Sequence, residues 1–114
     1  MKLRRPTDFL ILEALEERGR NVATNLSFHT EKSRKNINTR LPVLDDYGLV
    51  AKIGPAERSG LYEITARGRA AVELRAQYDE VDDWEDRVED LEETYETEDN
   101  PTQPGLARQV PGGL

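Results

Sequence analysis

The sequence predicts a mainly α-helical fold with one small β-hairpin, in the order helix, helix, helix, strand, strand, helix. Three observations predict this fold. Apolar residues recur at helical spacing in two segments, one beginning at residue 7 and one at residue 33. Two short runs rich in β-branched and aromatic residues, LVAKIG and LYEIT, then flank the charged segment PAERSG and indicate a hairpin. Helical spacing resumes after Thr65, which is a good N-cap residue.

The first helix is predicted to begin at Thr7 as its N-cap, with Asp8 in the first turn, where an acid suits the helix dipole. Phe9, Leu12 and Leu15 form its apolar stripe, and Gly19 stands where a helix C′ glycine belongs.

A short second helix is predicted in the segment NVATNLSFHT, with Asn21 as its cap. Val22, Leu26 and His29 share one face of this helix. We therefore expect His29 to be packed or hydrogen-bonded in the core rather than to bind a ligand.

The third helix is predicted to begin after Ser33 and to end at Gly48, with its apolar stripe at positions 37, 41 and 44. Pro42 falls inside this pattern. A proline there removes the hydrogen bond to the carbonyl of Asn38, at a cost of about 3 kcal/mol in a regular helix. We therefore expect the helix to kink or restart at Pro42, so that its first part, whose outer face could contact a partner, covers about residues 33–41.

Charge is distributed unevenly along the 114 residues, whose formal net charge is −7. Residues 1–75 hold 14 lysines and arginines against 10 acids, whereas residues 76–114 hold 2 against 13. A basic body with an acidic extension favours binding of a polyanion by the body. The 12 arginines, 4 lysines and 23 acids also resemble the lysine-poor, acidic composition of proteins from extreme halophiles.

Several classes of protein are excluded by composition. There is no cysteine and a single histidine, so disulfides, thiolate metal sites and multi-histidine metal sites cannot form. No apolar run could span a membrane and no signal peptide is evident, so a cytoplasmic protein is expected. No glycine-rich phosphate loop follows a strand, and the acids at positions 79, 80, 82 and 83 lack the glycine and glutamate of a calcium loop. We predict no catalytic residue, metal, cofactor or small-molecule ligand, and therefore no enzyme.

The acidic extension continues the helical pattern, with apolar residues spaced 4, 3, 3, 4, 3 and 4 apart. This spacing indicates a coiled-coil seam interrupted by a three-residue stammer, and it favours a homodimer. Packing of the helix on its own domain is the alternative. The predicted dimerisation residues are Leu74, Tyr78, Val81, Trp84, Val88, Leu91 and Tyr95. Residues 97–114 are rich in proline and glycine and are expected to be disordered.

The second and third predicted helices, joined by a short turn, form a helix-turn-helix, and the hairpin behind them would be a wing. A helix fits the DNA major groove, where arginine and lysine meet guanine and asparagine meets adenine. Side chains at 35, 38 and 39 point away from the predicted core, and those at 34 and 40 lie on the flanks. Arg34, near the helix start, joins the outward group that could reach bases, while Arg40 suits a phosphate contact. The wing, 54–60, could touch the minor groove or the backbone, and the N-terminal arginines could add phosphate contacts. The predicted DNA-binding residues are Ser33, Arg34, Lys35, Asn38, Thr39, Arg40, Arg58, Ser59, Arg4 and Arg5.

The segment RLPVLDDYGLV, followed by IGPAERSGLYEITARGRAAVELR, resembles the haloarchaeal winged-helix proteins known as phi-H-like phage repressors. The resemblance covers about residues 5–75. It implies a double-stranded-DNA-binding transcription regulator, most simply a repressor, located in the cytoplasm with the nucleoid. It also implies recognition by Arg34, Lys35, Asn38, Thr39 and Arg40 and wing contact by Arg58.

The predicted organisation is thus a winged helix-turn-helix domain at 1–75, an acidic dimerisation helix at 76–96 and a tail at 97–114. In molar salt the Debye length falls to about 3 Å, so binding would depend on direct contacts rather than on long-range attraction. Two alternatives stay open: a winged-helix module that binds another protein, and an acidic anti-repressor that does not bind DNA.

Overall fold

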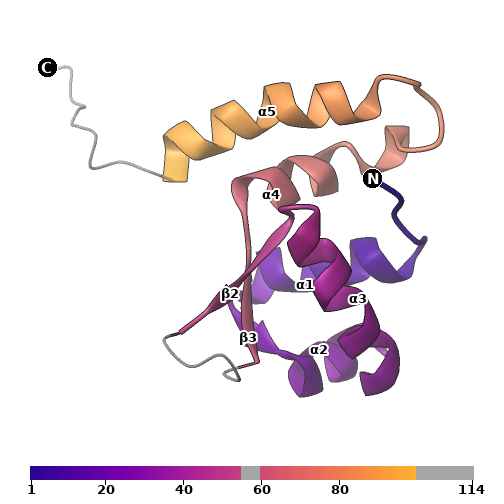
Figure 1. Ribbon diagram of the computed structural model, residues 1–114, viewed down its shortest axis with the longest axis vertical. Coiled ribbons are helices and arrows are strands. Elements are labelled where there is room, and N and C mark those ends of the chain that lie inside the picture. Colours follow the sequence, from indigo (N-terminus) through magenta and orange to yellow (C-terminus); the bar gives the residue numbers. More distant parts are fainter. Residues whose placement is uncertain (55–59, 100–114) are drawn as a thin grey trace, which may run out of the picture.

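The computed structural model describes residues 1–54 and 60–99. These residues form five α-helices, a short 3₁₀ helix and a three-stranded antiparallel sheet of order β1-β3-β2 (Figure 1). The mainly helical fold with a small sheet is confirmed. The elements in chain order are α1 (Thr7–Arg18), β1 (Asn21–Val22), α2 (Ala23–Thr30), α3 (Arg34–Asp46), β2 (Val50–Ile53), β3 (Leu61–Ile64), α4 (Ala66–Glu73), η1 (Arg75–Gln77) and α5 (Trp84–Asp99).

The helix ends follow the local chemistry of the sequence. Gly19 ends α1 with a φ of 82°, and its N–H donates to the carbonyl of Leu15 at 2.9 Å. Ser33 caps α3 by accepting from the N–H of Asn36 at 3.1 Å, and Thr65 caps α4 by accepting from the N–H of Gly68 at 3.0 Å. Thr7 differs slightly from its prediction, because it is the first residue of α1 rather than its cap.

The segment at 21–22 is a strand, which the sequence analysis did not predict. Asn21 pairs with Tyr62 and Val22 with Leu61, so the strand extends the hairpin to three strands. The helix that follows begins at Ala23, with Val22 at its N-cap position and no side-chain acceptor there. A two-residue strand shows no periodicity, and for this reason sequence spacing could not reveal it.

The third helix continues through Pro42 to Asp46, so the expected restart at Pro42 is wrong, while a kink there stays a prediction. Pro42 and Asn38 both lie on the exposed side of α3. The proline ring is therefore clear of the core, and the Asn38 carbonyl, which loses its helical donor, stays close to water. Beyond the proline, the N–H of Tyr47 still donates to the carbonyl of Val43 at 3.0 Å.

A single hydrophobic core joins helices and sheet. Its members lie on α1, α2, α3, α4, α5, β2 and β3 and in the adjoining turns, and they are buried together. They are Leu3, Phe9, Ile11, Leu12, Ala14, Leu15, Leu26, Ile37, Leu41, Leu44, Leu49, Val50, Tyr62, Ala70, Ala71, Val72, Trp84 and Val88.

Gly68 lets α4 approach the turn after α3. A Cβ atom at this position would lie 2.1 Å from the carbonyl oxygen of Leu49 and 2.6 Å from Cγ1 of Ile64. The backbone oxygen cannot move out of the way as a flexible side chain could. Only glycine therefore permits this contact between α4 and the sheet.

The C-terminal extension folds back on the body, so the predicted continuous seam is wrong. The helical chain breaks after Glu73, and α5 begins anew at Trp84 and packs along α4 (Figure 1). Trp84 is 3% exposed and donates from its indole nitrogen to the carbonyl of Leu74 at 2.8 Å, while Val88 is fully buried. The Trp84 ring also packs edge-on against Phe9 and Tyr78. Residues 76–96 thus share the core of residues 1–75.

The other predicted seam residues are partly buried against the same core: Leu74, Tyr78, Val81, Leu91 and Tyr95. This is the alternative in which the helix packs on its own domain. A homodimer stays a prediction, but Trp84 and Val88 cannot form its interface without unfolding this core. Of the tail predicted to be disordered, residues 97–99 belong to α5, and 100–114 lie outside the described residues.

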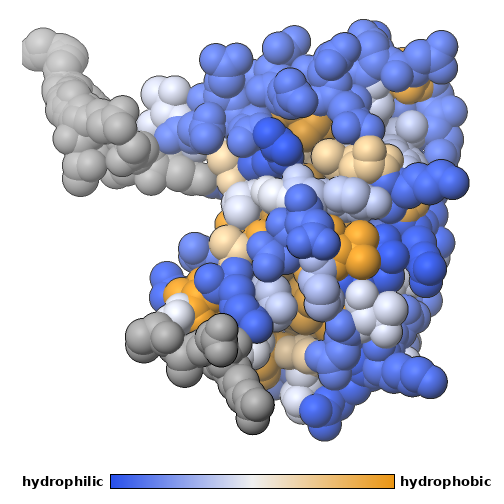
Figure 2. Space-filling model, in the orientation of Figure 1, coloured by the Kyte–Doolittle hydropathy of each residue, from blue (hydrophilic) through white to orange (hydrophobic). Residues whose placement is uncertain are grey.

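Polar contacts fix α5 on α4. Arg67 donates to Glu92 at 2.9 Å, and that hydrogen bond raises the pKa of its guanidinium. The hydroxyl of Tyr95 donates to Glu73, and the guanidinium of Arg69 lies 4.6 Å from the centre of the Tyr95 ring. On the face seen in Figure 2, hydrophilic residues cover α5, and hydrophobic residues show beneath it.

Candidate nucleic-acid interface

The third helix presents a polar face away from the core. Ile37, Leu41 and Leu44 are buried, with exposed fractions of 2% or less. Four side chains on the remaining surface of the first two turns are exposed, as the helical spacing predicts: Arg34, Lys35, Asn38 and Thr39. They provide two cations, an amide and a hydroxyl, which are the groups that read base edges in a major groove. Thr39 also donates to the carbonyl of Lys35 at 2.8 Å within the helix.

Arg40 does not belong to this face, and the prediction that it contacts phosphate is wrong for this structure. Its side chain is 7% exposed and donates to both carboxylate oxygens of Asp8, at 2.9 and 2.8 Å. Asp8 is fully buried and also accepts from the backbone N–H of Arg4 at 2.7 Å. The bidentate bond to Asp8 raises the pKa of Arg40. The pair therefore fastens the start of α1 to the middle of α3.

Apart from the buried Arg40, the cations on and around α3 have no acidic partner among the described residues, as is also the case for Lys2, Arg4 and Arg18. Within the described residues, no ion pair involves Lys32, Arg34, Lys35 or Lys52. Seven arginines are paired with acids: Arg5, Arg20, Arg40, Arg67, Arg69, Arg75 and Arg87. In a chain with 23 acids, unpaired cations gathered around one helix leave a surface suited to an external anion.

A groove of about 430 Å³ lies between α3 and the sheet, beside these cations. Lys52 of β2 pairs directly with Tyr62 of β3, so both side chains are on the sheet face that borders the groove. Arg34 and Asn38 border it from α3. The full lining is Val22, Ala23, Thr24, Arg34, Asn38, Leu41, Pro42, Lys52, Gly60 and Tyr62.

Lys52, Tyr62 and Thr24 were not predicted to belong to a site. Lys52 stands among apolar residues in the predicted strand, and alternation alone would have put it on the exposed face. That pattern could have identified it. No pattern in the sequence places Tyr62 or Thr24 beside α3, because their positions depend on the pairing of β1 with β3.

The two N-terminal arginines differ in their surroundings. Arg5 donates from Nε to Asp79 at 2.7 Å, and its guanidinium lies 5.2 Å from the centre of the Phe9 ring. It is thus engaged in holding the segment after η1 against α1. Arg4 is exposed, and no ion pair involves it within the described residues. Arg58 and Ser59, predicted at the tip of the wing, lie outside the described residues.

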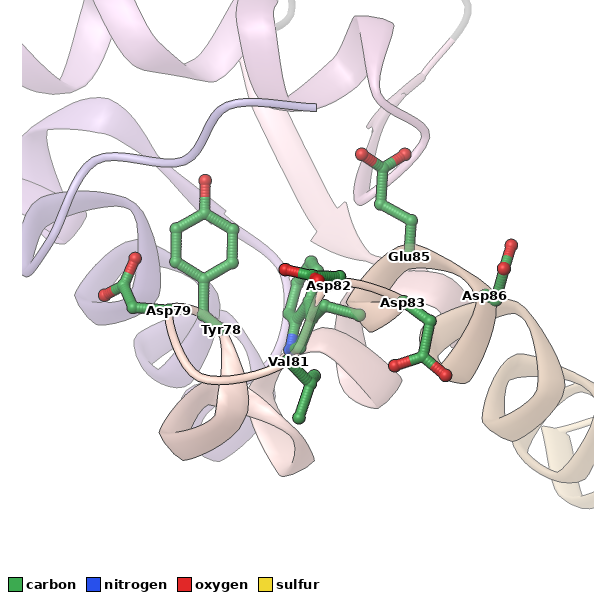
Figure 3. Close-up of a pocket in the computed structure, with 8 residues that line it drawn as sticks. Tyr78, Asp79, Val81, Asp82, Asp83, Glu85 and Asp86 are labelled. Carbon is green, nitrogen blue, oxygen red and sulfur yellow. The ribbon is translucent and has the colours of Figure 1, made fainter.

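A second hollow, of about 310 Å³, lies before and within the first turn of α5 and is acidic. Figure 3 shows the carboxylates of Asp79, Asp83, Glu85 and Asp86 pointing in different directions rather than toward one point. Within 1–54 and 60–99, no group of three or more histidine or acidic side chains is placed to hold a metal ion. This hollow is therefore a solvated acidic surface.

No protein-family model, curated protein or solved structure matches this chain. None of the helices in the part of the chain that the structure describes has both the length and the apolar character to cross a membrane.

Proposed function

We propose that this chain is a winged helix-turn-helix protein that binds double-stranded DNA sequence-specifically and regulates transcription, most simply as a repressor. The single observation that carries the proposal is the exposed face of α3, with its unpaired cations Arg34 and Lys35 beside Asn38. A free amide and free cations on one helix face are the groups that direct base readout requires.

The arrangement of elements supports this proposal. A short α2 is followed by a three-residue turn and by α3, and an antiparallel hairpin follows α3 (Figure 1). In such a unit α3 would be the recognition helix in the major groove, and the hairpin would be the wing. The resemblance to haloarchaeal phage repressors rests on the sequence of this region, RLPVLDDYGLV and the segment IGPAERSGLYEITARGRAAVELR after it.

The proposal is tested by selecting binding sites from a random duplex library in molar KCl and then measuring affinities by gel shift. Asn38→Ala should lower affinity for the selected duplex by roughly 5- to 150-fold, because a bidentate contact to adenine contributes about 1–3 kcal/mol of discrimination. Affinity for an unselected duplex should be unchanged. Thr94→Ala, on the exposed surface of α5, is the matched control and should change neither value.

Equal losses on both duplexes would show that Asn38 does not read bases. If no duplex is enriched at all, DNA binding by this chain is wrong.

The acidic surface of α5 favours a second candidate, a module that binds another protein through this helix. Its exposed acids are Glu85, Asp86, Glu89, Asp90, Glu93 and Glu96. Because these acids repel phosphate, such a module would bind a basic partner and leave duplex DNA unprotected. The selection experiment therefore separates the two candidates.

A homodimer is part of the proposal, since two copies of α3 would read two half-sites of an operator. Sedimentation velocity of the full chain in molar KCl tests it: a species of twice the chain mass is expected, and a monomer at every concentration would contradict it.

A further inference from the structure

Side chains with hydrogen-bond donors line part of the groove between α3 and the sheet, and none of the described residues that line it is acidic. Lys52 and Arg34 border it from opposite sides, and neither has an ion-pair partner within the described residues. The acidic hollow by α5 is the reverse case, since five carboxylates line it. In a chain where acids outnumber lysines and arginines, a hollow whose described lining has two unpaired cations and no acid is suited to an anion.

Tyr62 adds a buried donor to this groove. The residue as a whole is only 8% exposed, yet its hydroxyl makes no hydrogen bond with any of residues 1–54 and 60–99. Buried hydroxyls are nearly always hydrogen-bonded, so this one lacks a partner that a ligand could supply. Burial first, and the charge of Asp45 second, raise the pKa of the Tyr62 phenol, so the group keeps its proton and can donate.

The start of α2 faces the same groove. Val22 occupies the N-cap position without a side-chain acceptor, and Ala23 and Thr24 line the groove. The Asn21 carboxamide, which could have capped the helix, accepts instead from Nδ2 of Asn25 at 2.7 Å. The first N–H groups of α2 are therefore free of a side-chain acceptor, and a helix N-terminus attracts negative charge.

We propose that this groove holds a phosphate group, contributed by the backbone of a bound duplex. The inference rests on the proposed function and adds a specific site to it. Lys52 and Arg34 supply the charge, the Tyr62 hydroxyl and the start of α2 supply hydrogen bonds, and the walls fix the position of the phosphate. Because Arg34 and Asn38 also belong to the exposed face of α3, a phosphate seated here would set the register of that helix on the bases.

Duplex binding by two variants tests the site. Lys52→Gln should reduce the slope of log K against log salt by about 0.9, the value for one lost phosphate contact. Tyr62→Phe keeps the buried ring and removes only the hydroxyl, and it should weaken binding to selected and unselected duplexes alike, about tenfold. Arg18→Gln is the matched control, since it removes another exposed cation without an ion-pair partner in the described part of the chain, and Arg18 does not line the groove. It should change neither quantity.

A titration of the full chain with inorganic phosphate, followed by NMR at constant ionic strength, separates this inference from the proposed function. Shifts are expected at the amides of Thr24 and Asn25 and at Tyr62, and they should disappear in Lys52→Gln and in Tyr62→Phe. Unaltered thermal unfolding of both variants checks that they fold.

If neither variant changes duplex affinity or the phosphate shifts, the groove is not a phosphate site, even where Asn38→Ala still lowers specific binding. If phosphate binds and the variants abolish it while duplex affinity stays the same, a free phosphate is the occupant and the backbone source is wrong. Phosphate binding without any duplex binding would support the site and overturn the proposed function.

Discussion

At the scale of single residues, the buried pair of Asp8 and Arg40 is the contact that most directly orients α3. The pair joins residues 32 positions apart, with both partners less than a tenth exposed. Sequence spacing put Arg40 on the flank of the helix, where a side chain can face either solvent or a neighbouring element. Periodicity cannot decide between those two environments. Arg40 is buried because it binds Asp8. The sequence indicated Asp8 only as an acid in the first turn of a helix, where it interacts favourably with the helix dipole.

Asp8→Asn should destabilise the protein by about 3–5 kcal/mol, because it keeps the shape of the side chain and leaves the Arg40 guanidinium buried without a counter-charge. Urea unfolding followed by circular dichroism measures this free energy. The control is Asp83→Asn, which breaks an exposed pair with Arg87 and should cost less than about 1 kcal/mol. Equal effects of the two substitutions would mean that the buried pair has no special part in holding α3.

At the scale of elements, Pro42 is the clearest conflict between local preference and tertiary structure. The helix runs through it, so the loss of one backbone hydrogen bond is offset by the burial of Ile37, Leu41 and Leu44 on the same helix. Pro42→Ala should therefore stabilise the chain by about 2–3 kcal/mol, the cost of a helical proline less the entropy it removes from the unfolded chain. Urea unfolding tests this. A destabilised variant would show that α3 needs its proline, for example to keep a local bend.

Tyr95 links α5 to α4 and makes their association dependent on pH. Its hydrogen bond to Glu73, together with burial, raises its pKa to about 12, against about 10 in an unfolded chain. The folded chain thus keeps the phenol proton between these values while the unfolded chain has lost it. The free energy of unfolding should be unaffected by this group below pH ~10 and should fall as pH rises from about 10 to about 12.

Tyr95→Phe should flatten that alkaline decline, as measured by urea unfolding at a series of pH values. Tyr47→Phe is the control, because the Tyr47 hydroxyl contacts the backbone of Lys2 and not Glu73. This substitution should leave the decline in place. A decline that is equally steep in the wild-type chain and in Tyr95→Phe would assign it to another group.

The elements that the sequence predicted well are those fixed by local chemistry. The caps at Ser33 and Thr65, the glycine end of α1 and the hairpin strands all depend on residues within a few positions of one another. The exposed face of α3 follows in the same way from its buried stripe. The two-residue strand β1 depends on partners about 40 positions away in β3, and the break before α5 depends on the fit of Trp84 against Phe9 and Tyr78. The regular spacing of the predicted seam correctly identified residues that are buried or partly buried, but they pack in the core of their own chain.

At the scale of the whole molecule, the acidic surface of α5 lies apart from the unpaired cations Arg34 and Lys52 that border the groove. The acidic helix α5 runs along one end, and α2 lies at the other, with the groove at its start (Figure 1). The acids of α5 are thus kept away from the unpaired cations beside α3, where they would compete with an external anion for Arg34 and Lys52. The division seen along the sequence, a basic body and an acidic extension, persists in three dimensions even though the two share one core.

That shared core predicts the result of removing the extension. A chain ending at Glu80 would lose Trp84 and Val88 from the core and would expose Phe9, so it should not unfold cooperatively. Trp84→Ala in the full chain isolates the largest of these contacts and should cost about 3–5 kcal/mol. Glu89→Ala, on the exposed side of the same helix, should change stability by less than about 0.5 kcal/mol. Urea unfolding measures all three chains. If the shortened chain unfolds cooperatively at the midpoint of the full chain, α5 is an independent appendage, free to serve as the dimerisation helix that sequence spacing suggested.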